Sequence, residues 1–569
     1  MSRNELKSNR RVINREFRFG VHLPEDKDEH TGKVYRPDTI VVKEKVHYSD
    51  GTSEPKLRLY KNYQRPYYIT KKIYRNHKQN KQTEKLERVQ KFMTTQSNMT
   101  KDIMTRLGRR KFGNVSMRDV RFSPYVYGAE IHAVNLLRAE YQEKQTEITP
   151  YTVMFYDIEN DVNTKEISVV TGVHEKDGIV YIHTFINYNV IPAVVNIKKI
   201  IEDLFWKHIP DGYFKKEDVE FHITGYKDDG EVIKAFFEHV HRTEYDFLTA
   251  WNHTHDMGTM VERMHHHGLN PAEILSDPRL PKEYRYYHFK EGRTVKVKEN
   301  GDKQSLDFEK QWHSYIIPAS WYAIDAMSTY YFTRIGAPEV VGGYGLNNIL
   351  YNVLGLGKLK FDELTDLTQA EWHIYMLEKH PYEYIVYNIW DVLGMYLLEK
   401  KNKDLSLTLP LLADKTNFYD FSSSSTRIMD DFHFLALKHG KVLGTQVIGE
   451  EFYGSLTRNN WTVTLEPWRS AFHTYRLFTD AELINNFTFY VYDADAVSAY
   501  PSATIVANLS KETTMREIIS IGDIDREEFK RNNINLMTGS IAHIDYCVSM
   551  FNFPTFRELD EMAKEELGI

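Results

Sequence analysis

The stretch YTVMFYDIEN, residues 151–160, is a short apolar and aromatic run that ends in two acidic side chains, Asp157 and Glu159. Val, Ile, Phe and Tyr favour β-strands, and side chains two apart on a strand leave the same face. Both carboxylates can therefore bind one cation site. An Asp-x-Glu pair alone is weak support, because an acidic chain contains several by chance, so its meaning depends on the rest of the sequence.

Two further stretches carry acidic residues in a matching order. FLTAWNHTHDMGTMVERM (247–264) reads as a strand, then Asn252, then a helix that begins near Asp256. EYIVYNIWDVLGMYLLEK (383–400) reads as an amphipathic helix with Tyr387 and Asp391 four apart, and hence on one face. The series Asp-x-Glu, Asn-x-x-x-Asp and Tyr-x-x-x-Asp resembles the three exonuclease motifs of the family B DNA polymerases.

Phosphodiester hydrolysis needs an activated water and neutralisation of the negative charge on the attacking and leaving oxygens. Two divalent cations can do both. Carboxylate oxygens suit Mg²⁺ or Mn²⁺. The resemblance implies two ions in the exonuclease site, with Asp157 bridging them and Glu159 and Asp391 on the nucleophile side. It further implies that Asp256 completes the leaving-group side and that Tyr387 orients the attacking water.

Other stretches bear on the resemblance. GGYGLNNILYNVLGLGKLKFDEL (342–364) resembles the corresponding segment of replicative polymerases of T-even-like bacteriophages. GLGKLK is not a phosphate-binding loop, because the Gly spacing is wrong and no Ser or Thr follows Lys358. His255 departs from the Phe or Tyr usual in the family. The three consecutive histidines at 265–267 are predicted to form an exposed helix end rather than a metal site.

A second acidic stretch, FYVYDADAVSAYPSATIVANLSKETT (489–514), resembles motif A of the family B polymerase palm. The resemblance implies that Asp495 is a palm metal ligand. It also implies that Ser498, Ala499 and Tyr500 bind the incoming dNTP, with Tyr500 beneath the sugar. Ala499 stands where the family usually has Leu.

The other polymerase motifs are not found after residue 502: no Lys-x-x-x-Asn-x-x-Tyr-Gly helix follows, and no Asp-Thr-Asp occurs in the sequence. We therefore expect the N-terminal subunit of a split family B DNA polymerase. A second polypeptide would carry fingers, the rest of the palm and thumb, and its palm carboxylate would share a further metal pair. Two alternatives remain: a free-standing single-strand 3′→5′ DNA exonuclease, and a non-catalytic replisome scaffold. The intact motif A opposes the first alternative, and the full acid set opposes the second.

Composition limits the protein class. The chain has 569 residues and one cysteine, Cys547, which excludes an internal disulfide framework and a Cys-based zinc site. No apolar run is as long as a membrane span and no signal peptide is recognisable, so we expect no membrane contact and a cytoplasmic location, in an infected bacterial cell if the phage resemblance holds.

The net charge of −7 is unevenly distributed, because residues 1–120 carry 29 Lys and Arg against 14 Asp and Glu. The basic stretch 61–120 indicates contact with DNA phosphates, or else a solvated helix face. The predicted DNA-binding residues are Asn252, Lys71, Lys72 and Arg75. The predicted partners are primer–template and single-stranded DNA, dNTP, the second polypeptide and other replisome components.

The expected fold class is multidomain, α/β and α+β. We expect an N-terminal α+β domain (1–150) and a ribonuclease H-like 3′→5′ exonuclease domain with a mixed sheet and flanking helices (151–403). A return segment to the N-terminal domain (404–465) and a partial palm with motif A (466–569) would follow. Locally, the patterns predict strands over 38–75, a helix over 78–107, a hairpin at 294–308, helix over 369–402 and a loop at FSSSSTR (421–427).

Overall fold

The computed structural model describes residues 10–444, except 29–30, 77–82, 109–119, 121–122, 147, 298–301, 336–339, 360–366 and 413–417. The predicted palm segment, with Asp495, Ser498, Ala499 and Tyr500, lies outside the described residues. Among those described, no helix is both long and apolar enough to cross a membrane.

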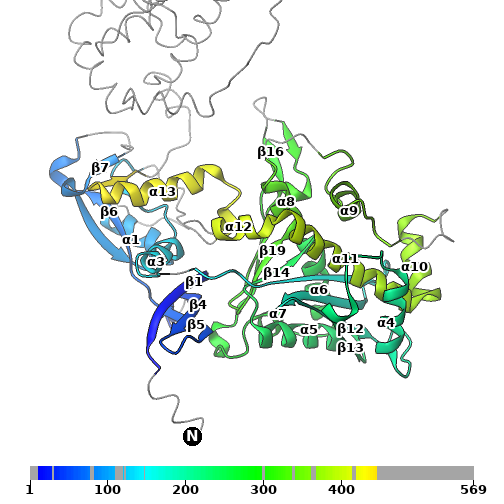
Figure 1. Cartoon of the computed structure of the whole chain (residues 1–569). Helices are drawn as coiled ribbons and strands as arrows, with labels where there is room; N and C mark the ends of the chain where they lie inside the picture. The colour runs from blue at the N-terminus through cyan, green and yellow to red at the C-terminus, as the bar shows by residue number, and fades with distance from the viewer. Residues whose placement is uncertain are drawn as a thin grey trace, which may run out of the picture. The chain divides into compact units, whose positions relative to one another are not determined.

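A six-stranded mixed sheet is the largest sheet of the described part (Figure 1). Its strands, in spatial order, are β13 (Val219–Tyr226), β12 (Ile179–Asn187), β11 (Ile167–Lys176), β10 (Val153–Asn160), β14 (Phe247–Ala250) and β19 (Tyr322–Asp325). Strand β11 is antiparallel to both neighbours, whereas the β12–β13, β10–β14 and β14–β19 pairs are parallel. This mixed topology is consistent with the ribonuclease H-like fold that the resemblance implies.

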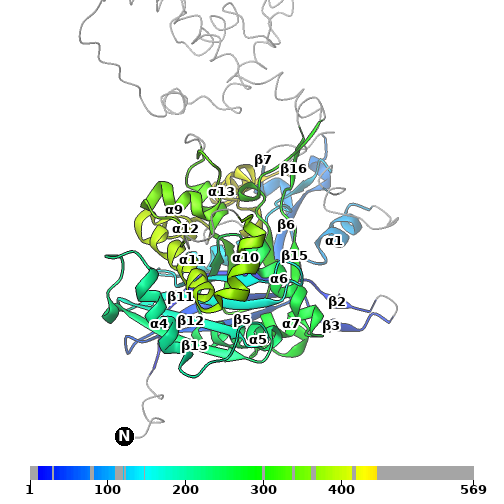
Figure 2. The same ribbon diagram turned by 90° about the vertical axis from the view of Figure 1, so that its right-hand side faces the viewer.

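Helices cover both faces of this sheet, with α11 on one side and α5 on the other (Figures 1 and 2). The helices that flank the sheet or follow its strands are α4 (Ile197–His208), α5 (Asp229–Thr243), α6 (His253–His266), α7 (Pro271–Leu275), α8 (Ala326–Phe332), α9 (Leu346–Leu354), α10 (Gln369–Lys379) and α11 (Pro381–Asn402). Because both faces are covered, β10 is apolar on both: Phe155 joins the α11 side, and Met154 and Tyr156 join the α5 side. Asp157 and Glu159 therefore share the face of Phe155, toward α11.

The N-terminal part contains two small sheets. One is formed by β1 (Val12–Leu23), β4 (Thr39–Tyr48) and β5 (Ser53–Lys61), with α3 (Ala133–Gln142) against β1. The other is formed by β8 (Val89–Thr94), β6 (Arg65–Thr70) and β9 (Val126–Tyr127). After α12 (Asp404–Leu412) and α13 (Ser424–Lys438) the chain returns to this region, where β20 (Lys441–Leu443) pairs with β7 (Thr83–Lys85).

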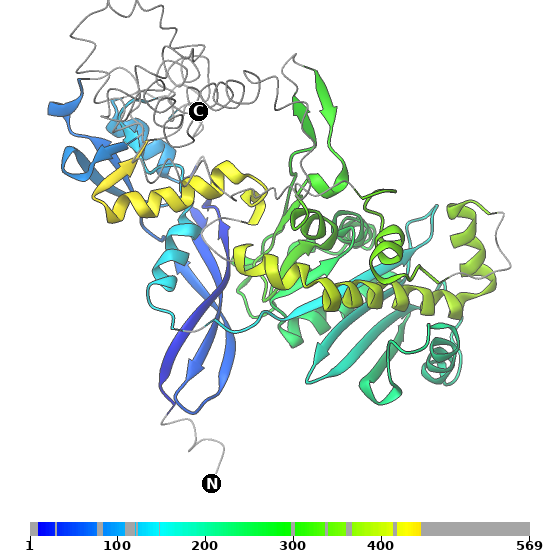
Figure 3. The same ribbon diagram turned by 45° about the horizontal axis from the view of Figure 1, so that its top comes forward.

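Three short ribbons complete the described strands, and in the first of them β2 (Asp26–Lys27) pairs with β3 (Val34–Arg36). β15 (His288–Lys290) pairs with β18 (Ser314–Ile316), and β16 (Val295–Val297) pairs with β17 (Lys303–Ser305). The β16–β17 ribbon projects from the part of the chain that contains the six-stranded sheet (Figure 3). The antiparallel pairing agrees with the hairpin predicted at 294–308, although its turn is not described.

The helix predicted over 78–107 is wrong for most of that stretch. Residues 83–85 and 89–94 are strands, and among residues 83–107, the part of this stretch that is described, only α1 (Met99–Arg106) is α-helical. β8 pairs with β6 from Val89 opposite Thr70 to Thr94 opposite Arg65. The helix-like spacing of charges in KQTEKLERVQKF is a local pattern, and non-local strand pairing overrides such weak preferences.

One further local prediction is wrong, and the helix predicted over 369–402 is confirmed with one interruption. The serine run expected to form a loop instead begins a helix, because the Ser423 hydroxyl accepts a hydrogen bond from Thr426 N and caps α13. The helical stretch 369–402 is two helices, since α10 ends before His380 and α11 begins at Pro381, a residue favoured at the first helical position.

Candidate nuclease site

Three carboxylates predicted as metal ligands lie together where β10 meets α11. One oxygen from each of Asp157, Glu159 and Asp391 lies within 4.8 Å of the other two. β10 supplies the first two residues from one strand face, and α11 supplies the third. The two elements are far apart in the sequence, so only the packing of α11 on the sheet brings these carboxylates together.

Asp256 lies in the first turn of α6, immediately after β14. β10 and β14 are parallel neighbours, so their carboxyl ends meet at one edge of the sheet, where ligand sites of such sheets form. Burial raises the pKa of Asp157 well above its usual range, and the charge of Asp256 raises it further. Asp256 is therefore an electrostatic neighbour of Asp157 and Glu159.

Burial and mutual repulsion dominate the electrostatics of this acid cluster, by which we mean Asp157, Glu159, Asp256 and Asp391. Burial, then the neighbouring Asp325 and Glu159, raise the pKa of Asp256 well above normal. Burial raises the pKa of Asp391 to about 6 although Lys358 opposes it. Such raised values mean that the charged forms lack full compensation from protein groups.

Three members of the acid cluster, Asp157, Glu159 and Asp391, also accept a hydrogen bond from a donor at or near α11. Asn388 Nδ2 donates to Asp157 Oδ2 (2.8 Å), and Tyr384 OH donates to Glu159 Oε2 (2.7 Å). Lys358 Nζ donates to Asp391 Oδ2 (2.5 Å) and to the Tyr387 hydroxyl (2.9 Å). Residues 384, 387, 388 and 391 share one helix face, so a single surface of α11 carries Asp391 and the donors to Glu159 and Asp157.

The donor set fits a divalent cation. Asp391 Oδ1 is buried and has no hydrogen-bond partner among the described residues. The candidate ligands are all carboxylate oxygens, which Mg²⁺ and Mn²⁺ prefer. An orphaned buried oxygen beside two further carboxylates is costly unless a cation completes it.

Residues 121–304 match the family model for the exonuclease domain of family B DNA polymerases. That segment is similar to a polymerase exonuclease domain. The match includes Asp157, Glu159 and Asp256, whereas Tyr387 and Asp391 lie beyond it. Their arrival at the same site is thus an observation of the structure, independent of the match. Among curated proteins, none matches the chain.

The predicted DNA-binding residues lie in two places. The side-chain amide oxygen of Asn252 accepts from His255 N (3.3 Å) and caps α6, beside the acid cluster. Lys71, Lys72 and Arg75 lie far along the chain, in and beside a single 3₁₀ turn after β6, where both lysines are exposed. Arg75 is partly engaged, since its Nε donates to Thr70 O (2.9 Å).

Sequence reasoning missed several residues of the site. The sequence marks Lys358 only as failing the phosphate-loop pattern, yet its ammonium lies among the carboxylates. Asp325, at the end of β19, accepts from His253 N (2.9 Å) and Ser328 N (2.7 Å) and so joins the starts of α6 and α8. A usable indication was its position: a carboxylate ending a strand parallel to β14. Lys358 offers no comparable pattern.

The histidine run at 265–267 divides. His265 and His266 are exposed at the end of α6, as predicted. His267 instead binds the buried Asp229 (Nε2–Oδ1 2.5 Å), which Arg263 also contacts (2.6 Å). The Asp229 carboxylate is thus satisfied by structural partners.

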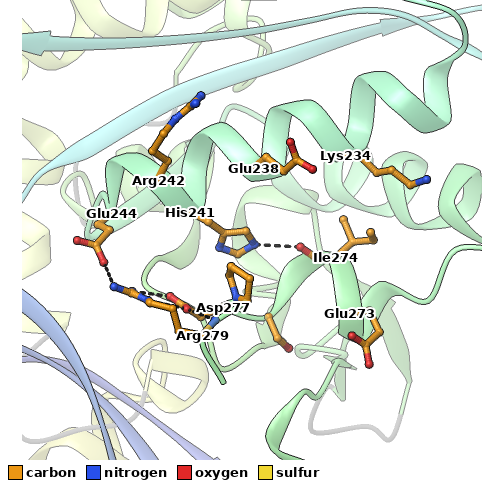
Figure 4. A pocket seen from close by; sticks show the side chains of 11 residues that line it. Lys234, Glu238, His241, Arg242, Glu244, Glu273, Ile274, Asp277 and Arg279 are labelled. Carbon is orange, nitrogen blue, oxygen red and sulfur yellow. Dashed lines mark hydrogen bonds and ion pairs between the residues drawn. The ribbon is translucent and has the colours of Figure 1, made fainter. Parts of the chain in front are cut away.

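A separate cavity of about 570 Å³ lies against the outer side of α5 and the segment that follows α7 (Figure 4). Some of its polar groups are engaged within its wall: Arg279 contacts both Asp277 and Glu244, and His241 Nε2 lies 2.9 Å from Ile274 O. No member of the acid cluster lines it, so this cavity is not part of the candidate nuclease site.

Proposed function

We propose that this chain is a metal-dependent 3′→5′ DNA exonuclease and the N-terminal part of a family B DNA polymerase. The observation that carries the nuclease proposal is the convergence of Asp157, Glu159 and Asp391 within 4.8 Å. The match of residues 121–304 supports the same function. Mg²⁺ or Mn²⁺ is the proposed cofactor, as a pair of ions.

The proposed roles follow the chemistry of the side chains. Asp157, Glu159 and Asp391 would hold the cations, with Asp256 on the leaving-group side. When bound, the cations would neutralise negative charge on the attacking and leaving oxygens and lower the pKa of a bound water. Tyr387, fixed beside Asp391 and Lys358, would orient that water. The Lys358 ammonium, 2.5 Å from Asp391 Oδ2, offsets part of the negative charge that would repel a phosphate.

The test is digestion of 5′-labelled single-stranded DNA by the purified full chain with Mg²⁺ or Mn²⁺. The double substitution Asp157→Ala with Glu159→Ala should lower the rate by at least about 100-fold, because both ions lose ligands. Asp203→Ala, an exposed carboxylate of α4, is the matched control. A wild-type chain without metal-dependent digestion from the 3′ end, or an unaffected double variant, contradicts the proposal.

We further propose that the basic N-terminal stretch binds DNA phosphates. Binding should weaken with salt, and replacing Lys71, Lys72 and Arg75 by Glu should reduce the slope of log K against log salt by about 0.7 for each contact with single-stranded DNA lost. Lys215→Glu with Lys216→Glu, two exposed lysines near β13, is the control. An unchanged slope in the triple variant means that this stretch is only solvated.

The polymerase part of the proposal rests on the resemblance of residues 489–514 to motif A and of residues 342–364 to phage replicative enzymes. A second palm carboxylate is needed to hold a metal pair, so the chain alone should extend no primer. Together with a polypeptide carrying fingers, the rest of the palm and thumb, it should polymerise dNTPs. In that complex Asp495→Ala should abolish synthesis and leave 3′ digestion nearly intact. Primer extension by the chain alone contradicts the split-site proposal.

A further inference from the structure

A chain of hydrogen bonds from α10 through α11 ends on one carboxylate of the acid cluster. Tyr384 OH donates to Glu159 Oε2 (2.7 Å), and His373 Nδ1 lies 2.8 Å from the Tyr384 oxygen. The phenol has one O–H, which donates its hydrogen bond to Glu159, so the imidazole N–H must donate to the phenol oxygen. This places a proton on His373 Nδ1. His373 Nδ1 also lies 3.4 Å from Glu159 Oε2.

The elements around this chain hold it in place. Thr368 and Glu371 form a capping box at the start of α10, which fixes where that helix begins. Trp372, the residue before His373, packs on the Tyr387 ring with centroids 4.8 Å apart. Tyr384 is fully buried. Rigid helices and packed rings are the conditions under which a second layer of residues can fix a ligand's orientation.

We infer that Tyr384 and His373 are positioning residues that hold the Glu159 carboxylate in one orientation for binding a divalent cation. The inference rests on the proposed nuclease function for its biological role, but cation binding can be measured without DNA. Groups that hydrogen-bond a metal ligand fix its geometry, and their loss typically weakens metal binding 10- to 100-fold. Neither residue belongs to the motif pattern that identified the acids. Tyr384 lies one helical turn before Tyr387, and His373 lies on a different helix.

The experiment measures binding of Mn²⁺ to the metal-free full chain, by electron paramagnetic resonance of free Mn²⁺ at constant pH. Tyr384→Phe removes only the hydroxyl and should weaken Mn²⁺ binding by roughly 10- to 100-fold. Tyr382→Phe is the matched control, because its hydroxyl binds Pro192 O outside the cluster. That control should bind Mn²⁺ within about twofold of wild type, the scatter expected for sites that do not interact.

His373 acts through Tyr384, and this predicts a specific pattern. His373→Leu should weaken Mn²⁺ binding less than Tyr384→Phe. His373→Asn should restore binding, because an amide N–H can occupy the place of Nδ1–H. The double variant Tyr384→Phe with His373→Leu should be no weaker than Tyr384→Phe alone, since effects within one chain of contacts are not additive. In digestion assays, excess Mn²⁺ should rescue Tyr384→Phe with KM for DNA unchanged.

The possible results separate this inference from the proposed function. Mn²⁺ binding that is absent from wild type, or equal in wild type and Tyr384→Phe, overturns the inference. Additive losses in the double variant overturn the role assigned to His373. If Mn²⁺ binding depends on Tyr384 but wild type digests no DNA, the positioning role stands and the exonuclease proposal fails. If wild type digests DNA but binding ignores Tyr384, the reverse holds.

Discussion

The buried His239 should make the unfolding free energy strongly dependent on pH. His239 is on α5, and the centroid of its ring lies 4.0 Å from that of His183 on β12 and 6.0 Å from that of Phe185. It is 6% exposed, and its Nε2 has no hydrogen-bond partner among the described residues. Burial, with smaller contributions from Arg242, His174 and His222, lowers its pKa from 6.5 to about 4.

The sign and size follow from linkage. The pKa in the folded state lies below that of the unfolded state, so the unfolded chain binds the proton more readily and stability falls as pH drops below 6.5. Between pH 7.5 and pH 5.0, values of 6.5 and about 4 give a loss of about 2 kcal/mol from this one group. The loss levels off below about pH 4, where both states are protonated.

The assay is urea unfolding of the full chain at pH 7.5 and 5.0, for wild type and for His239→Phe, which keeps an aromatic ring beside Phe185. Carboxylates titrate equally in both proteins, so the difference between the two pH dependences isolates His239. The loss of unfolding free energy between pH 7.5 and pH 5.0 should be about 2 kcal/mol smaller in the variant than in wild type. His222→Phe, an exposed member of the same ring stack, should change it far less. Equal pH dependence in wild type and His239→Phe refutes the reasoning.

Three further predictions concern the acid cluster and the backbone. In chelator, Asp157→Asn should raise the melting temperature, because a buried charge repelled by Asp256 and Glu159 is removed. Mn²⁺ should stabilise wild type more than this variant. A lower melting temperature of the variant in chelator would contradict the repulsion. Lys358→Met should destabilise the metal-free chain by about 3–5 kcal/mol, since the buried Asp391 carboxylate loses its half-buried counter-ion. Mn²⁺ should offset most of that loss in thermal unfolding. A variant as stable as wild type in chelator is incompatible with the pairing. Gly292→Ala should destabilise the protein more than Gly172→Ala. An added Cβ at 292 would lie 1.8 Å from the backbone carbonyl oxygen of Gln311, whereas one at 172 would lie 1.9 Å from the Met154 Cε, which can move. Urea midpoints in the opposite order would argue against the backbone clash at Gly292.

Part of the site was predictable because it is local. The strand ending in Asp157 and Glu159, the helix that begins near Asp256, and the Tyr387–Asp391 pair on a helix each follow from residue patterns over a short stretch. Such patterns give the side-chain face and the type of element. They do not give partners from elsewhere in the chain, which is why the local pattern predicts helix where the strand β8 forms.

The sequence by itself determined the candidate ligands: acidic side chains of the right type, on the right faces of short elements, in an order that resembles one family. Only the tertiary structure decided what surrounds them. Lys358, Tyr384, Asn388 and His373 reach the carboxylates because α10 and α11 pack beside β10, and no local pattern marks a residue as a donor to a distant carboxylate. The physical reason is that burial and non-local packing set which groups share a low-dielectric space, and that space raises the pKa of Asp391 to about 6.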